Sequence, residues 1–183
     1  MATQESWHFA SIFVRVFTMA IRQSDLFYSA TTRVPQGHVS KRSGQPTAFL
    51  SHSHKDMKLA LGLQETLRRE GWDVYIDWQD QAMPESPDAV TASRIKNAIV
   101  AADWFLFLAT QHSQASRWCP WEIGYADGKK RIEKIAIIPT TDNSGHYYGN
   151  EYLKLYNKID RASGGGLALF DPQGKGKWIR FLK

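Results

Sequence analysis

Cysteine is nearly absent from this chain, with a single residue, Cys119, among 183. One thiol excludes an internal disulfide framework and is typical of a reducing compartment, so we expect a cytoplasmic protein. Long hydrophobic runs are missing as well. The longest, such as residues 104–109, are far shorter than the ~20 residues that span a bilayer. We therefore expect no membrane association, and no stretch has the pattern of a secretory signal.

A long block of one charge is also lacking. The net charge of +5 comes from 23 Lys and Arg against 18 Asp and Glu, scattered along the chain. Only residues 33–42 and 175–183 are locally basic, which is typical of a linker and a solvated face. We expect no nucleic-acid partner, and the same balance suits a small anionic ligand.

The chain divides into two parts near residue 46. Bulky residues recur at approximately helical spacing over residues 7–27, which predicts an amphipathic helix for packing or oligomerisation. Residues 31–46 lose this periodicity and are rich in Pro, Gly, Ser and basic residues, as in a linker. We predict an N-terminal helix with its linker over residues 1–46 and a globular domain over residues 47–183.

The second part alternates short apolar strands with helices. The expected strands cover residues 47–50, 73–77, 104–109, 134–139 and 167–170. Helices are expected from a capping box at Ser53 and Asp56 to about residue 70, over 89–101, from Ser116 onward, and over 175–183. This alternation predicts an α/β fold with one doubly wound parallel sheet.

Polar residues follow three of these strands, where ligands bind in such sheets. They are the turn from Ser51 to Asp56, the pair Asp77 and Trp78, and the loop into the helix that carries Glu122.

The helix that starts near Ser116 is the least ordinary element. Ser116 can cap it, and Pro120 falls in the first turn, where its missing N–H costs nothing. Glu122 is preceded and followed by aromatic residues, namely Trp118, Trp121 and Tyr125. We expect these rings to desolvate the carboxylate partly and to offer stacking for a planar ligand.

Several chemistries compete for these residues. His52, His54 and Asp56 after a strand are spaced like a metal site of a hydrolase, but Met57 stands where a third histidine is needed. Cys119 is a candidate nucleophile, although a lone cysteine at a helix start is more often packed. Glycine-rich phosphate loops and a Gly-x-Ser-x-Gly elbow are absent from the sequence.

A single carboxylate among aromatic rings can stabilise a positively charged ribosyl centre. Cleavage of a nicotinamide–ribose bond needs no metal and no strong acid, because the pyridinium leaving group is already cationic.

Four segments together carry a resemblance to a known family. They are residues 48–56 (Ala-Phe-Leu-Ser-His-Ser-His-Lys-Asp), residues 74–77 (Val-Tyr-Ile-Asp), the polar loop from Trp78 to Pro87, and residues 116–122 (Ser-Arg-Trp-Cys-Pro-Trp-Glu). The last segment matches a Trp-Cys-x-x-Glu signature at Trp118, Cys119 and Glu122. In this order and spacing, the chain from about residue 47 resembles a bacterial Toll/interleukin-1 receptor (TIR) domain. The resemblance does not cover residues 1–46.

The resemblance implies a flavodoxin-like parallel sheet of about five strands and, in the active branch of the family, cleavage of NAD as the substrate, with no separate cofactor or metal. It places the catalytic carboxylate at Glu122. It places the nucleotide against Ser51 and His52, against Asp77 and Trp78, and against Trp118. Active relatives often carry an arginine in the first turn, where this chain has Ser53 and His54.

The resemblance leaves two main functions open. One is an NAD glycohydrolase or ADP-ribosyl cyclase of antiphage defence, whose cyclic or modified ADP-ribose signals to a separate effector. The other is a non-catalytic scaffold that self-associates through the BB loop, residues 78–87. A metal-dependent hydrolase using His52 and His54 is a third.

Overall fold

The computed structural model describes residues 19–32, 44–79 and 89–182. Five strands form the parallel centre of its sheet. In chain order they are β2 (Thr47–Ser51), β3 (Asp73–Tyr75), β4 (Trp104–Ala109), β5 (Ile135–Thr141) and β7 (Asn157–Arg161). They lie side by side as β3-β2-β4-β5-β7, with every neighbouring pair parallel. This is the flavodoxin-like order, so the prediction of a doubly wound parallel sheet is confirmed.

Shorter strands extend this sheet within the described residues. β8 (Leu167–Phe170) and β9 (Gly176–Trp178) continue it beyond β7 in antiparallel fashion. β1 (Ile21–Arg22) and β6 (Tyr147–Tyr148) both pair with the carboxyl end of β5.

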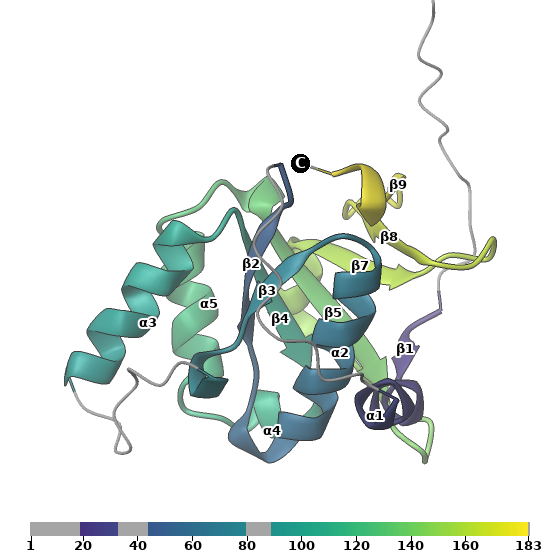
Figure 1. Cartoon of the computed structure of the whole chain (residues 1–183), viewed down its shortest axis with the longest axis horizontal. Coiled ribbons are helices and arrows are strands. Elements are labelled where there is room, and N and C mark those ends of the chain that lie inside the picture. The colour runs from purple at the N-terminus through teal and green to yellow at the C-terminus, as the bar shows by residue number, and fades with distance from the viewer. Residues whose placement is uncertain (1–18, 33–43, 80–88, 183) are drawn as a thin grey trace, which may run out of the picture.

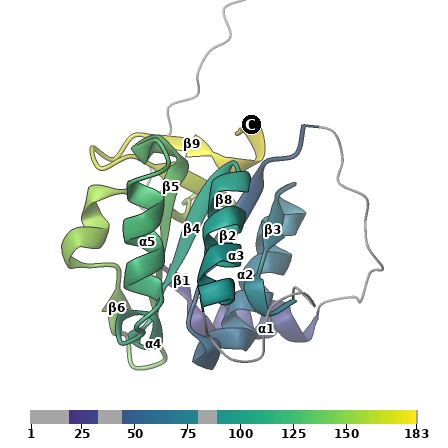
Figure 2. The same ribbon diagram turned by 90° about the vertical axis from the view of Figure 1, so that its left-hand side faces the viewer.

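Helices cover both faces of the sheet (Figures 1 and 2). α1 (Gln23–Thr31) and α2 (Met57–Arg69) lie on one face, and α3 (Ala89–Ala101) and α5 (Cys119–Asp127) lie on the other. The short α4 (Gln111–Gln114) lies between β4 and α5. Short 3-10 helices lie in several of the segments that connect these elements. They are η1 (His54–Asp56), η2 (Asp77–Gln79), η3 (Ile132–Lys134), η4 (Glu151–Leu155) and η5 (Ile179–Phe181).

The core has two halves because the strands alternate their side chains between the faces. Leu106 of β4 lies in one core cluster with Leu63 of α2, whereas Phe105 lies in the other with Ile99 of α3. Every residue of β4 is buried, as the wholly apolar run predicted.

The N-terminal helix differs from the prediction. Residues 7–18 lie outside the described part, and Ile21 and Arg22 form a strand rather than a helix. The helix starts at Gln23 and runs to Thr31, where the linker was expected to begin. Pairing with β5 is the reason, since it takes the backbone bonds that a helix would use. The expected linker falls mostly on residues 33–43, which also lie outside the described part.

At the C-terminal end the sequence analysis missed one strand, and its prediction of a closing helix was wrong. β7 was missed, because its Lys158, Asp160 and Arg161 hide the apolar alternation of a strand. The expected helix over residues 175–183 is β9 followed by the single turn η5, since β9 pairs with β8 and the turn inserts Ile179 into the core.

Candidate active site

Three loops meet at the carboxyl edge of the sheet, as the sequence predicted. Ser51 is the last residue of β2, and His52 follows it. Asp77 opens the turn η2 directly beyond β3. Thr110 leaves β4 and leads through α4 to α5, which carries Glu122.

The start of α5 explains why Glu122 lies where it does. The Ser116 hydroxyl accepts hydrogen bonds from the backbone N–H groups of Trp118 (3.1 Å) and Cys119 (3.3 Å). Ser116 therefore caps the turn as predicted, but the helix begins at Cys119, so Pro120 is its second residue. Glu122 falls in the first turn, with its N–H bonded to the carbonyl of Trp118 at 2.8 Å.

Glu122 is buried, with an exposed fraction of 4%. Burial raises the pKa of its carboxyl group to about 8; the Ser51 hydroxyl opposes this rise, and the Asp77 carboxylate adds to it. The N-terminal end of a helix favours a carboxylate, but here the loss of water outweighs that effect. Oε2 of Glu122 and Oγ of Ser51 are both buried without a hydrogen bond of ordinary geometry in the described residues. The site thus holds a carboxyl group poised between its two protonation states near neutral pH.

Cys119 lies beside this carboxyl group and is fully buried. Burial raises the pKa of its thiol to about 12, and the charge of Glu122 contributes to the rise. Since the thiolate is the reactive form, the geometry gives no support to Cys119 as a nucleophile.

His52 is held in one tautomer by two neighbours. Its Nε2 accepts a hydrogen bond from Nε1 of Trp78 at 2.9 Å, so the proton is on Nδ1, which donates to the carbonyl of Leu50 at 3.1 Å. Burial lowers the pKa of His52, which keeps the ring neutral although Asp77 lies 4.0 Å away. This contact brings Trp78 and Asp77 against the turn after β2, where the sequence expected them.

The same contacts speak against the metal alternative. Both ring nitrogens of His52 are occupied, and Asp56 accepts hydrogen bonds elsewhere. Among the described residues, no group of three or more His, Cys, Asp or Glu is arranged to hold a metal ion.

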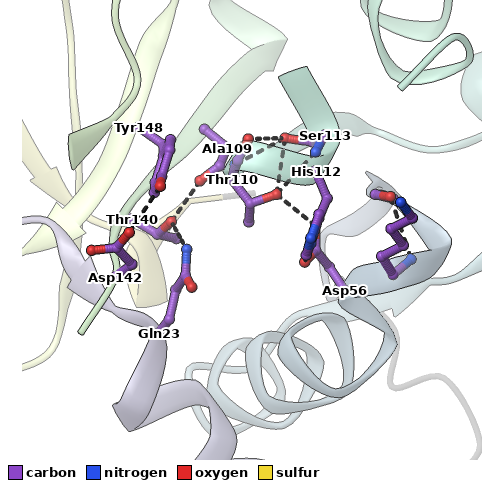
Figure 3. A network of polar contacts seen from close by, with 11 residues as sticks. Gln23, Asp56, Ala109, Thr110, His112, Ser113, Thr140, Asp142 and Tyr148 are labelled. Atoms are coloured by element: carbon purple, nitrogen blue, oxygen red, sulfur yellow. Dashed lines mark hydrogen bonds and ion pairs between the residues drawn. The ribbon is translucent and has the colours of Figure 1, made fainter. Parts of the chain in front are cut away.

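Asp56 instead organises the loop before α5, a role that sequence reasoning missed. Its carboxylate accepts from the Thr110 hydroxyl at 2.5 Å and pairs with Nδ1 of His112 at 2.8 Å (Figure 3). Thr110 and Ser113 form a capping box at the start of α4. The predicted cap at Ser53 is confirmed, since its hydroxyl accepts from the N–H of Lys55 at the start of η1. The capping box is not complete, because Asp56 bonds Thr110 and His112 of the next loop instead of returning to Ser53.

The aromatic residues of α5 make contacts with each other. Trp118 is partly buried and meets Trp121 edge to face, with ring centres 5.4 Å apart. Trp121 stacks on Tyr125 at 6.0 Å, and Lys96 of α3 lies over both rings. The rings of Trp121 and Tyr125 thus contribute to the contact between α3 and α5. Trp118 lies at the N-terminal end of α5 and contacts Trp121 there.

The comparison with known proteins defines the class. Residues 48–163 match the family described as "TIR domain", which is more than half of the chain, so the chain belongs to the TIR domain family. No helix within the described residues has the length and apolar character to cross a membrane.

One similar protein carries a name that states an activity. Over 119 residues the chain is 38% identical to a Bacillus cereus (strain MSX-D12) protein named "Probable 3' cyclic ADP-D-ribose synthase ThsB'". The alignment covers 63% of this chain and 61% of the relative. This chain therefore spans less than two thirds of the relative's length.

Proposed function

We propose that this protein cleaves NAD at the bond between nicotinamide and ribose and converts the remainder into a cyclic or otherwise modified ADP-ribose. The observation that carries the proposal is Glu122, a buried carboxyl group with a raised pKa at the carboxyl edge of the sheet. The name of the Bacillus cereus relative, a cyclic ADP-ribose synthase, supports the cyclising outcome.

The chemistry suits a single carboxylate. The bond between C1′ and the pyridinium nitrogen breaks, its electron pair leaves with nicotinamide, and the ribose carries the positive charge. Ionised Glu122 stabilises that charge in a site that excludes water. A hydroxyl oxygen then attacks C1′ and gives its proton to the carboxylate or to water. Attack by water yields ADP-ribose, and attack by a hydroxyl of the same molecule yields a cyclic product.

Glu122 is the proposed catalytic residue, and five further residues are proposed to bind the substrate. Ser51, His52, Asp77 and Trp78 lie together at the ends of β2 and β3 and would contact the ribose and phosphates. Trp118, one turn before Glu122, would stack against a ring of NAD.

The proposal extends to the protein's biological setting. We place it in the cytoplasm as part of antiphage defence, with its product sensed by a separate effector. Self-association through the BB loop, residues 78–87, would complete the site between neighbouring subunits. Most of that loop lies outside the described residues.

The test is to incubate wild-type protein and Glu122→Gln with NAD at high protein concentration and to separate the products by chromatography. We expect nicotinamide from the wild type alone, together with a second product that distinguishes hydrolysis from cyclisation. Equal release by Glu122→Gln would remove Glu122 from the chemistry. No release by the wild type would favour the non-catalytic assembly scaffold.

A further inference from the structure

A cavity of about 1040 Å³ lies apart from the Glu122 site. It forms at the carboxyl ends of β5 and β7, which pair only at Ala136 and Ile137 and then separate. The N-terminal segment enters between them: Met19 bridges to Arg161, and Ile21 pairs with Thr140. The cavity is lined by parts of this segment, α1, β6 and β7, and by none of the residues that surround Glu122.

The walls of the cavity carry paired charges of both signs. The Asp25 carboxylate forms ion pairs with Arg22 at 3.1 Å and with Arg161 at 3.3 Å, so one carboxylate holds two guanidinium groups. On β7, Nζ of Lys158 lies 2.7 Å from Oδ2 of Asp160. Three cations thus face two carboxylates, and the excess of positive charge favours an anionic ligand.

Two buried polar atoms on these walls lack a partner among the described residues. They are Oδ1 of Asp160, whose residue is 1% exposed, and Nε of Arg161, the next residue along β7. A buried carboxylate oxygen without a donor is costly, and native proteins rarely leave such groups unsatisfied. A ligand that donates a hydrogen bond to Oδ1 of Asp160 and accepts one from Nε of Arg161 would satisfy both atoms.

Two tyrosines supply flat surfaces on the same cavity. Tyr28 projects from α1 and is 71% exposed, and Tyr147 of β6 is 41% exposed. Burial raises the pKa of Tyr147, and the charge of Asp160, which lines the same cavity, raises it further.

We propose that this cavity is a second nucleotide site, which binds a nucleoside diphosphate. Ribose hydroxyls donate to Asp160, as carboxylates commonly hold a ribose diol. The phosphates accept from Arg22 and Arg161, whose planar guanidinium groups suit phosphate oxygens. The base stacks on Tyr28 or Tyr147. Lys158 pairs with Oδ2 of Asp160 and leaves Oδ1 as the oxygen that accepts from the ribose.

The experiment is a calorimetric titration with ADP. We expect Arg22→Gln and Asp160→Asn each to raise the Kd about tenfold or more, since each loses a charge-assisted hydrogen bond. Arg22→Gln changes a side chain that is 72% exposed, so its fold is expected to be intact even if Asp160→Asn is unstable. Glu133→Gln, a carboxylate change at an exposed pair, is the matched control and should leave the Kd unchanged.

Two further arms decide between this cavity and the Glu122 site. ADP should bind more tightly than 2′,3′-dideoxy-ADP, and Asp160→Asn should abolish that difference. Trp118→Ala should leave ADP affinity unchanged. Loss of ADP binding in Trp118→Ala but not in Arg22→Gln would overturn the proposal, as would no binding of millimolar ADP by wild-type protein. NAD cleavage is measured in a separate assay, so neither result of the ADP titration decides whether the proposed NAD-cleaving function is correct.

Discussion

At the scale of single residues, Glu122 combines two features that oppose each other. Its position in the first turn of α5 favours the ionised form, and its 4% exposure favours the neutral form. Burial prevails and the pKa rises to about 8. A carboxyl group of this kind gains its charge only in part at neutral pH, and the approach of a cationic pyridinium would favour ionisation further.

This pKa predicts the pH dependence of the proposed reaction. Only ionised Glu122 stabilises the ribosyl cation, so kcat/KM for NAD should rise about tenfold per pH unit below a pKa of about 8 and then level off. The measurement is nicotinamide release at low NAD over this range, with thermal melts at each pH to show that the protein stays folded. A flat profile between pH 6 and 9 would contradict the prediction.

The same shift predicts the stability of Glu122→Gln. Between pH 4.5 and about 8 the folded protein keeps the proton that the unfolded chain has lost. The unfolded state therefore binds fewer protons, and the free energy of unfolding falls by about 1.4 kcal/mol per pH unit. Glutamine carries no charge to bury, so Glu122→Gln should raise the Tm at pH 8 by several degrees and change it little at pH 5.

Differential scanning calorimetry at the two pH values tests this expectation, with Glu133→Gln as the control at an exposed carboxylate. A lower Tm for Glu122→Gln at pH 8 would show that the carboxylate itself holds the fold together.

At the scale of elements, the N-terminal segment is built into the domain. Leu26 of α1 is buried against the core cluster that contains α2. Gln23 donates to the Thr140 hydroxyl at 3.0 Å, and Thr140 donates to the carbonyl of Ala109 at 2.6 Å (Figure 3). This chain of contacts ties α1 to the ends of β5 and β4, next to the loop that leads to Glu122.

Gly62 permits the close approach of α1 to α2. A Cβ added at Gly62 would overlap the backbone carbonyl of Leu26, so the two helices would have to part. We expect Gly62→Ala to destabilise the protein by about 1–3 kcal/mol, despite alanine's better helix propensity. Gly124→Ala is the matched control, since a Cβ there meets nothing within 4 Å.

Thermal melts of the two variants measure the difference, with a loss of about 2–4 °C per kcal/mol for a domain of this size. If Gly62→Ala melted no lower than Gly124→Ala, α1 would not pack against α2 in solution.

At the scale of the whole molecule, the proposal requires that neighbouring subunits meet. Replacing residues of the 78–87 loop should lower specific NAD cleavage more at low protein concentration than at high, because mass action compensates for a weakened contact. Activity assays across a concentration series, paired with sedimentation, measure this. A loss that is the same at every concentration would assign the loop another role.

The sequence by itself determined the architecture and the position of the carboxylate. The periodic apolar runs predicted β4 and α3 over the residues observed, and the cap and proline before Glu122 predicted a helix start close to the one observed. These features are local, so neighbouring residues suffice to specify them.

Tertiary structure alone decided what local pattern could not express. The pairing of Asp56 with His112 joins residues 56 apart in the chain. The strand β7 is defined by its pairing with β5 and β8, which its own sequence does not indicate. The tautomer of His52 depends on Trp78, and the pKa values of His52 and Glu122 depend on burial by several segments. All of these properties depend on elements that meet only in the folded protein, and the pKa shifts arise because those elements exclude water.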